Sequence, residues 1–126
     1  MGEFSPLVIE HFTHPRHARP LAAPDGVGWV KRSDSRFMQI QLMLKGDVID
    51  AIAFGTYGCA PSIACGSYVC EWAYGDTWQR AGTLTVEAVL TALGGLPPHR
   101  RDSAEMAVEA LQQAVASALR NQRNGA

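Results

Sequence analysis

The sequence has 126 residues, of which 47% are hydrophobic and 18% are charged. This length and balance are typical of one folded domain and argue against a disordered chain. A formal net charge of −1 argues against binding to nucleic acid or to an anionic membrane. The apolar runs are too short for a membrane-spanning helix, and the N-terminus does not have the pattern of a signal peptide. We therefore expect a single cytoplasmic domain over residues 1–126.

The first half of the chain predicts a helix followed by a small antiparallel sheet. Apolar side chains recur at helical spacing over residues 4–12, and Pro15 ends this helix. Three further segments have the composition and partial alternation of strands: residues 27–30, 36–44 and 48–54. The turn Lys45-Gly46-Asp47 joins the last two strands, which are therefore expected to pair in antiparallel orientation.

The second half of the chain predicts helices. Pro61 suits the first turn of a helix that runs to about Tyr74. A shorter helix is predicted over residues 85–93, and the last helix is expected to start near Asp102, which has capping-box spacing to Glu105. The expected architecture is α+β, with a small three-stranded antiparallel sheet covered by about five helices.

Three cysteines, Cys59, Cys65 and Cys70, lie within twelve residues. An odd number so close together is a poor disulfide framework, so we interpret them as metal ligands, nucleophiles or small buried residues. Cys59 precedes a helix N-terminus, where unpaired N–H groups stabilise a thiolate. On a regular helix, Cys65 and Cys70 are about 140° apart and cannot hold the same ion. Cys65 can approach Cys59 and is either a ligand or a packed side chain, whereas Cys70 is expected to fill the core.

Two carboxylates are further candidate ligands for iron or zinc. For each of them a structural role is favoured over metal binding: Asp102 as the N-cap of the last helix, and Asp34 as a turn residue in a Ser-Asp-Ser loop. The histidines around the first helix, His11, His14 and His17, are expected to be structural or solvated. Because the sequence shows no Gly-rich phosphate loop, nucleophile elbow or paired-carboxylate signature, we do not expect an enzyme.

Four segments, in this order, share a pattern with one protein family. They are SPLVIEHFTHPRH at residues 5–17, AIAFGTYGCAPSIACGS at residues 51–67, Glu71-Trp72 followed by Gly75, and LPPHR at residues 96–100. From Ser5 to Leu119, the chain resembles the IscU/NifU family of iron–sulfur cluster assembly scaffold proteins. The resemblance implies the α+β fold of that family.

The resemblance also implies a cluster site, at which this chain keeps one of three cysteines. Cys59 matches the family's second cysteine, and Asp34 falls at or next to the position of the first. Asp102-Ser103 replaces the His-Cys pair of the last helix. We therefore expect a divergent scaffold that binds iron, zinc, or a labile or shared iron–sulfur cluster through Cys59, with Cys65, Asp34 and Asp102 as further metal ligands. The alternative is a ligand-depleted relative that acts as a metal-free adaptor or regulator of cluster assembly.

Partners are implied by the resemblance as well. The segment Leu96-Pro97-Pro98-His99-Arg100 resembles the family's binding segment for a dedicated Hsp70-type chaperone, and its alternative interpretation is a rigid linker. His99 could replace the missing histidine after a small loop shift. A cysteine desulfurase is the second implied partner, and a cluster shared between chains would require a homo-oligomer.

Overall fold

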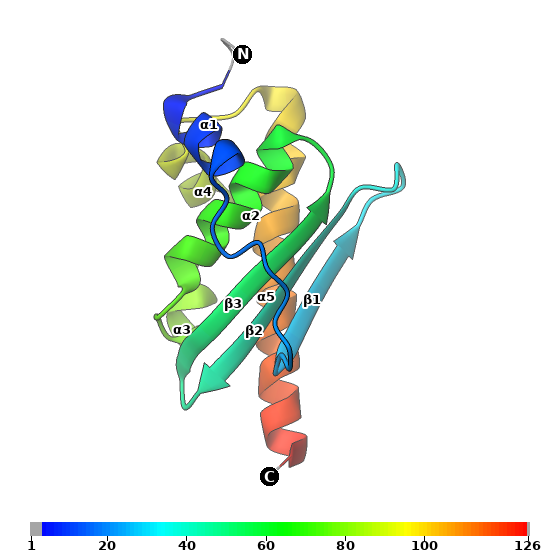
Figure 1. The fold of residues 1–126 in the computed structure, drawn as a ribbon, viewed down its shortest axis with the longest axis vertical. Coiled ribbons are helices and arrows are strands. Elements are labelled where there is room, and N and C mark those ends of the chain that lie inside the picture. Colours follow the sequence, from blue (N-terminus) through cyan, green and yellow to red (C-terminus); the bar gives the residue numbers. More distant parts are fainter. Residues whose placement is uncertain (1–3, 126) are drawn as a thin grey trace.

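The computed structural model describes residues 4–125, which form an antiparallel sheet and five α-helices (Figure 1). In chain order the elements are α1 (Pro6–Thr13), β1 (Gly26–Lys31), β2 (Phe37–Lys45), β3 (Val48–Tyr57), α2 (Ala60–Ala73), α3 (Trp78–Ala81), α4 (Val86–Ala92), the 3-10 helix η1 (Pro98–Arg100) and α5 (Arg101–Gly125). The predicted α+β fold with a three-stranded antiparallel sheet is confirmed. Within residues 4–125, the helices are too short or too polar to cross a membrane.

The sheet has the strand order β1-β2-β3, and both neighbouring pairs are antiparallel. A register shift between Met43 and Leu44 marks a bulge near the β2–β3 turn. Gly46 has a φ of 64° in that turn, a conformation that glycine adopts without steric cost. The predicted turn at Lys45-Gly46-Asp47 therefore has the residue that its backbone needs.

The long helix α5 packs closely against β1, because β1 presents glycines to it. A Cβ atom added to Gly28 would lie 1.9 Å from the carbonyl oxygen of Ala110, and one added to Gly26 would lie 2.3 Å from that of Ala114. In β1 the residues facing α5 are buried and alternate with exposed ones. The core that results between the sheet and the helices includes Met38, Ile40, Leu42, Ile49, Val69, Cys65, Cys70, Met106 and Leu111.

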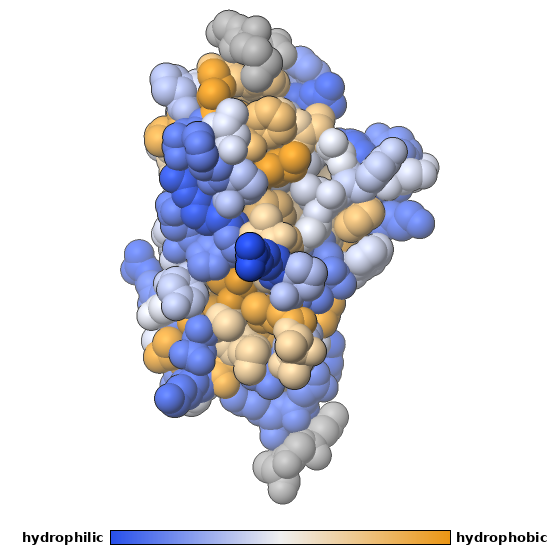
Figure 2. Space-filling model, in the orientation of Figure 1, coloured by the Kyte–Doolittle hydropathy of each residue, from blue (hydrophilic) through white to orange (hydrophobic). Residues whose placement is uncertain are grey.

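The segment between α1 and β1 runs across the strands on the side that α5 does not cover (Figure 1). It is held there by a hydrogen bond from the Phe54 amide to the His17 carbonyl, at 2.9 Å, and by one from the Leu21 amide to Gln41 Oε1, at 2.8 Å. Figure 2 shows that hydrophobic residues gather along the middle of this face, between hydrophilic borders.

Two features differ from the sequence-based expectations. Helix α3 was not predicted, because its four residues depend on a tertiary contact: Asp47 accepts hydrogen bonds from the Trp78 indole, at 3.1 Å, and from the Gln79 amide group, at 3.2 Å. The expectation that Asp102 is an N-cap was wrong. Helix α5 already begins at Arg101, directly after η1, and the Asp102 side chain pairs with Arg36 instead.

Candidate functional site

Three chain segments meet at one end of the sheet: the loop before β2, the N-terminus of α2 and the N-terminus of α5. Side-chain contacts join them in two pairs, from Arg36 to Asp102 and from Ser62 to Ser103. We call this region the Cys59 tip and define it by Asp34, Arg36, Cys59, Ser62, Asp102 and Ser103. The tip brings together the positions that the resemblance assigned to the cluster ligands.

Cys59 is the N-cap residue of α2. Its backbone is extended, with φ −102° and ψ 178°, and its carbonyl oxygen accepts hydrogen bonds from the amides of Ser62 and Ile63. The side chain is half-buried, and the sulfur lies 3.7 Å from the Ser62 hydroxyl. The helix N-terminus stabilises negative charge on such a sulfur. Cys59 therefore lies directly before the first turn of α2 and is partly exposed, as predicted, and its reactivity stays a prediction.

The other two cysteines lie in the core. Cys65 and Cys70 are both completely buried. Burial raises the pKa of Cys65 to about 12, with a smaller contribution from the negative charges of Cys59 and Asp102. Burial also raises the pKa of Cys70. Cys70 is thus the core residue that was predicted, and the burial of Cys65 supports packing over metal binding for that residue.

Arg36 joins the two predicted carboxylate ligands. Its Nε lies 2.8 Å from Asp34 Oδ2, and its Nη2 lies 2.5 Å from Asp102 Oδ2. Hydrogen bonds from the Arg36 backbone amide and then its guanidinium lower the pKa of Asp34, and the guanidinium lowers that of Asp102. Both carboxylates are therefore ionised at neutral pH. Arg36 was not among the residues singled out from the sequence, because its partner Asp102 is 66 positions away.

Residues 3–124 match the model of the NifU-like N-terminal domain. The chain belongs to this family. The family membership that the sequence predicted is therefore confirmed.

Relatives of this NifU-like chain are similar over most of its length. The iron–sulfur cluster assembly scaffold protein IscU 1 of Archaeoglobus fulgidus is 37% identical over 97% of this chain and 79% of the relative. IscU of Aquifex aeolicus is 32% identical over 95% and 78%, and IscU of Azotobacter vinelandii is 34% identical over 89% and 91%.

Solved structures agree with the NifU-like fold. A candidate scaffold protein for the SUF system from Fervidobacterium islandicum superposes with a TM-score of 0.73, at 16% identity over 90% of this chain and 97% of that one. The N-terminal part of a NifU-like protein from Brucella abortus gives 0.65, at 22% identity over 97% and 95%. At these identities the likeness shows the fold alone.

The side chains of this NifU-like tip do not fit a metal ion within one chain. Among residues 4–125, no three His, Cys, Asp or Glu side chains are close enough together to hold one. The guanidinium of Arg36 lies between the two carboxylates, so a positive charge already occupies the space where a cation would bind them. The metal site composed of Asp34, Cys59, Cys65 and Asp102 stays a prediction.

The histidines near α1 have structural or solvated surroundings. His11 is buried, and its Nδ1 lies 2.8 Å from the Ser67 hydroxyl. Because Ser67 Oγ accepts a hydrogen bond from the Arg16 amide at 2.9 Å, its own proton is available to His11 Nδ1. Burial, followed by the charge of Arg16, lowers the pKa of His11 against the opposing effect of nearby glutamates. His14 is exposed.

The predicted partner segment forms the connection into α5. Leu96 packs against the core, whereas Pro98 and His99 are exposed. A hollow of about 300 Å³ lies beside this segment and is lined by Leu90, Gly95, Leu96, Pro98 and Arg101. The structure thus leaves part of the segment accessible, and its role in partner binding stays a prediction.

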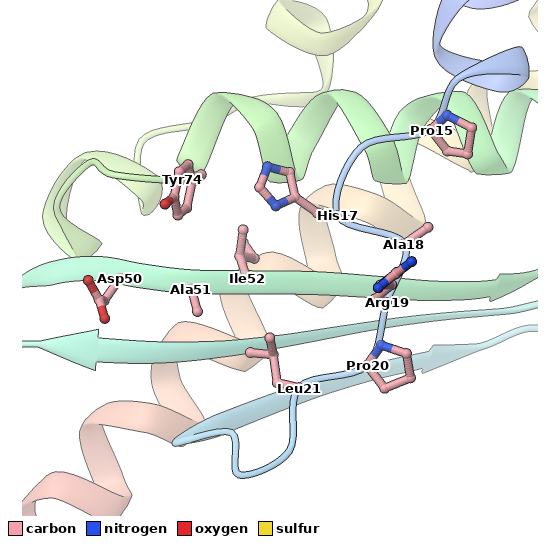
Figure 3. Close-up of a pocket in the computed structure, with 10 residues that line it drawn as sticks. All are labelled: Pro15, His17, Ala18, Arg19, Pro20, Leu21, Asp50, Ala51, Ile52 and Tyr74. Carbon is pink, nitrogen blue, oxygen red and sulfur yellow. The ribbon is translucent and has the colours of Figure 1, made fainter.

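A second hollow, of about 600 Å³, was not predicted from the sequence (Figure 3). It lies where the segment between α1 and β1 crosses β3, and its walls include His17, Leu21, Ile52 and Tyr74. The His17 and Tyr74 rings are 5.1 Å apart. The lining residues come from separate parts of the chain, so no local sequence pattern indicates the hollow.

Proposed function

We propose that this chain is a divergent scaffold-type protein of iron–sulfur cluster assembly, which handles iron, zinc or a labile or shared cluster through Cys59. Its family membership and its identity to proteins named as IscU scaffolds support this role. The role is that of a carrier of metal or cluster and not of an enzyme. We further propose that it acts in the cytoplasm.

The observation that carries the proposal is the position of Cys59. Of the three cysteines it alone is partly exposed, and it caps α2 where three segments of the chain converge. Iron–sulfur clusters are held mainly by several thiolates, which one accessible cysteine cannot supply. A cluster at this tip would therefore be labile or shared with a second chain.

The competing function is that of a metal-free adaptor or regulator of cluster assembly. The Arg36 ion pairs favour it, because they engage both carboxylates of the Cys59 tip. An adaptor would need only the family fold and its partner surfaces. By resemblance, these partners are a cysteine desulfurase and an Hsp70-type chaperone, the second at Leu96-Pro97-Pro98-His99-Arg100.

Anaerobic reconstitution with iron and sulfide separates the two functions. For a cluster-handling protein, we expect a visible chromophore and iron in metal analysis of the wild type, and the loss of both in Cys59→Ser. Cys70→Ser is the matched control, because it also removes one sulfur but leaves the Cys59 tip unchanged. If the wild type shows neither a chromophore nor iron or zinc above background, the adaptor function is supported instead.

A further inference from the structure

We propose that Arg36 determines what the Cys59 tip can bind, because its guanidinium takes the place that a divalent cation would occupy between Asp34 and Asp102. The inference concerns the same site as the proposed function and rests on it only for the role of Cys59. Arg36 is a specificity-determining residue in this proposal: it makes no bond to a ligand but excludes one class of ligand.

The geometry of the guanidinium is the first support. Two of its nitrogens bond two different carboxylates, Nε to Asp34 and Nη2 to Asp102, at 2.8 and 2.5 Å. Asp34 belongs to the loop before β2, and Asp102 belongs to the first turn of α5. One cationic group thus bridges two anionic side chains from distant segments, as a metal ion bound by carboxylates does.

The place of Arg36 relative to Cys59 is the second support. A Cβ atom added to Gly58 would lie 3.9 Å from Arg36 Cγ and 2.9 Å from the Ser62 hydroxyl. The Arg36 side chain therefore runs past the residue that precedes Cys59. The cation that bridges the carboxylates and the thiol of Cys59 belong to one small region.

Unused binding capacity at Asp102 is the third support. Its Oδ1 is buried and has no hydrogen-bond partner within residues 4–125. Arg32 and Arg100 are also close enough to lower the pKa of this carboxyl, but Arg32 is paired with Glu109 at 3.6 Å. Asp102 thus keeps one oxygen uncommitted while Arg36 holds the other.

Removal of the guanidinium charge should therefore open a cation site. Within residues 4–125 of the wild type no three such side chains are close enough together to hold an ion, so Asp34, Asp102 and Cys59 would have to move together to supply two oxygens and one sulfur, a mixed set that suits Zn²⁺ or Co²⁺. Without a positive charge between them, the two carboxylates also repel each other, and a divalent cation relieves that repulsion. In the wild type, Arg36 keeps the two carboxylates closed to a divalent cation and leaves Cys59 available for the proposed metal or cluster handling.

Titration with Co²⁺ tests the inference, because a Co²⁺–thiolate bond gives an absorption band that reports the sulfur separately from affinity. We expect Arg36→Gln to bind Co²⁺ about tenfold more tightly than the wild type, or better, a change of the size that one removed charge produces. Arg36→Lys keeps the charge and should bind like the wild type. Arg101→Gln, which removes an arginine that pairs with Glu87 and Glu105, is the matched control and should also bind like the wild type.

Three results would overturn the inference: equal Co²⁺ affinity in Arg36→Gln and the wild type, a gain in Arg36→Lys as large as in Arg36→Gln, or the same gain in Arg101→Gln. Circular dichroism checks the fold of each variant, and Arg36→Ala is a second neutral variant if Arg36→Gln does not fold. The double variant Cys59→Ser/Arg36→Gln separates this inference from the proposed function. If it keeps both the affinity gain and the band, Arg36 excludes cations as inferred, but Cys59 is not the sulfur ligand.

Discussion

The sulfur of Cys59 lies 3.7 Å from the hydroxyl of Ser62, one turn into the helix that Cys59 caps. The same hydroxyl lies 3.3 Å from that of Ser103 in the first turn of α5. Both serines are buried, so their hydroxyls bond each other away from water. Ser62 thus links Cys59 to α5 through side-chain contacts. A change in the packing of α5 would therefore shift the Cys59 thiol.

Alkylation of the native protein should modify Cys59 first and Cys70 last. Cys59 is partly exposed at a helix N-terminus, whereas Cys65 and Cys70 are completely buried and have raised pKa values. Mass spectrometry of peptides after timed treatment with iodoacetamide measures the order. In the unfolded protein, which is the control, the three rates should become similar. Fastest reaction at Cys70 would place the reactive thiol further along α2 and contradict the assignment of Cys59.

Asp102→Asn should destabilise the protein at neutral pH by about 1 kcal/mol, through loss of a charge-assisted hydrogen bond from Arg36. The pKa of Asp102 is lower in the folded state than its ordinary value of 3.8. This stabilisation is therefore complete above that value and is lost as pH falls through the lower folded pKa. Urea unfolding at neutral and at strongly acidic pH measures both limits.

The matched control for that prediction is Glu105→Gln. Glu105 also lies in the first turns of α5, but its contact with Arg101 is a half-exposed pair at 3.6 Å. Its replacement should change the free energy of unfolding by less than about 0.5 kcal/mol. A deficit in Asp102→Asn that persists at acidic pH would show that the carboxylate charge is not its cause.

His11 should make the protein less stable under mildly acidic conditions. Burial lowers its folded pKa below 6.5, so the folded state disfavours the proton that the unfolded state accepts. The contribution of His11 to the free energy of unfolding should be constant above pH 6.5. It should become increasingly unfavourable as pH decreases from 6.5 to the folded pKa. Thermal unfolding across this range should show a flatter profile in His11→Gln. A wild-type slope in His11→Gln would contradict the prediction.

Gly28→Ala should destabilise the protein by about 1–3 kcal/mol, because overpacking forces apart elements that fit closely. The added Cβ would lie 1.9 Å from the Ala110 carbonyl oxygen, so β1 and α5 must separate. Gly55→Ala in β3 is the matched control, since a Cβ there meets nothing within 4 Å in the described structure. Chemical denaturation measures both variants. Equal stability of Gly28→Ala and Gly55→Ala would mean that β1 does not depend on close contact with α5.

Local chemistry explains why most elements could be predicted. Gly46 permits the turn between β2 and β3, and Pro61 suits the first turn of α2. The position of Cys59 before that helix follows from the same short stretch. Such features depend on neighbouring residues, so they can be recognised in a sequence.

Only the tertiary structure decided the chemistry around Cys59. Asp102 had the spacing of a helix cap, but the folded chain brings Arg36 from 66 positions away to its carboxylate. Cys65 was suitable as a ligand or as a core residue, and only the packing of the helices on the sheet showed it to be buried. The sequence by itself determined the family, the strands and the capping position of Cys59, because these depend on local pattern. The partners of each tip side chain depend on contacts between distant segments, which exist only once the chain has folded.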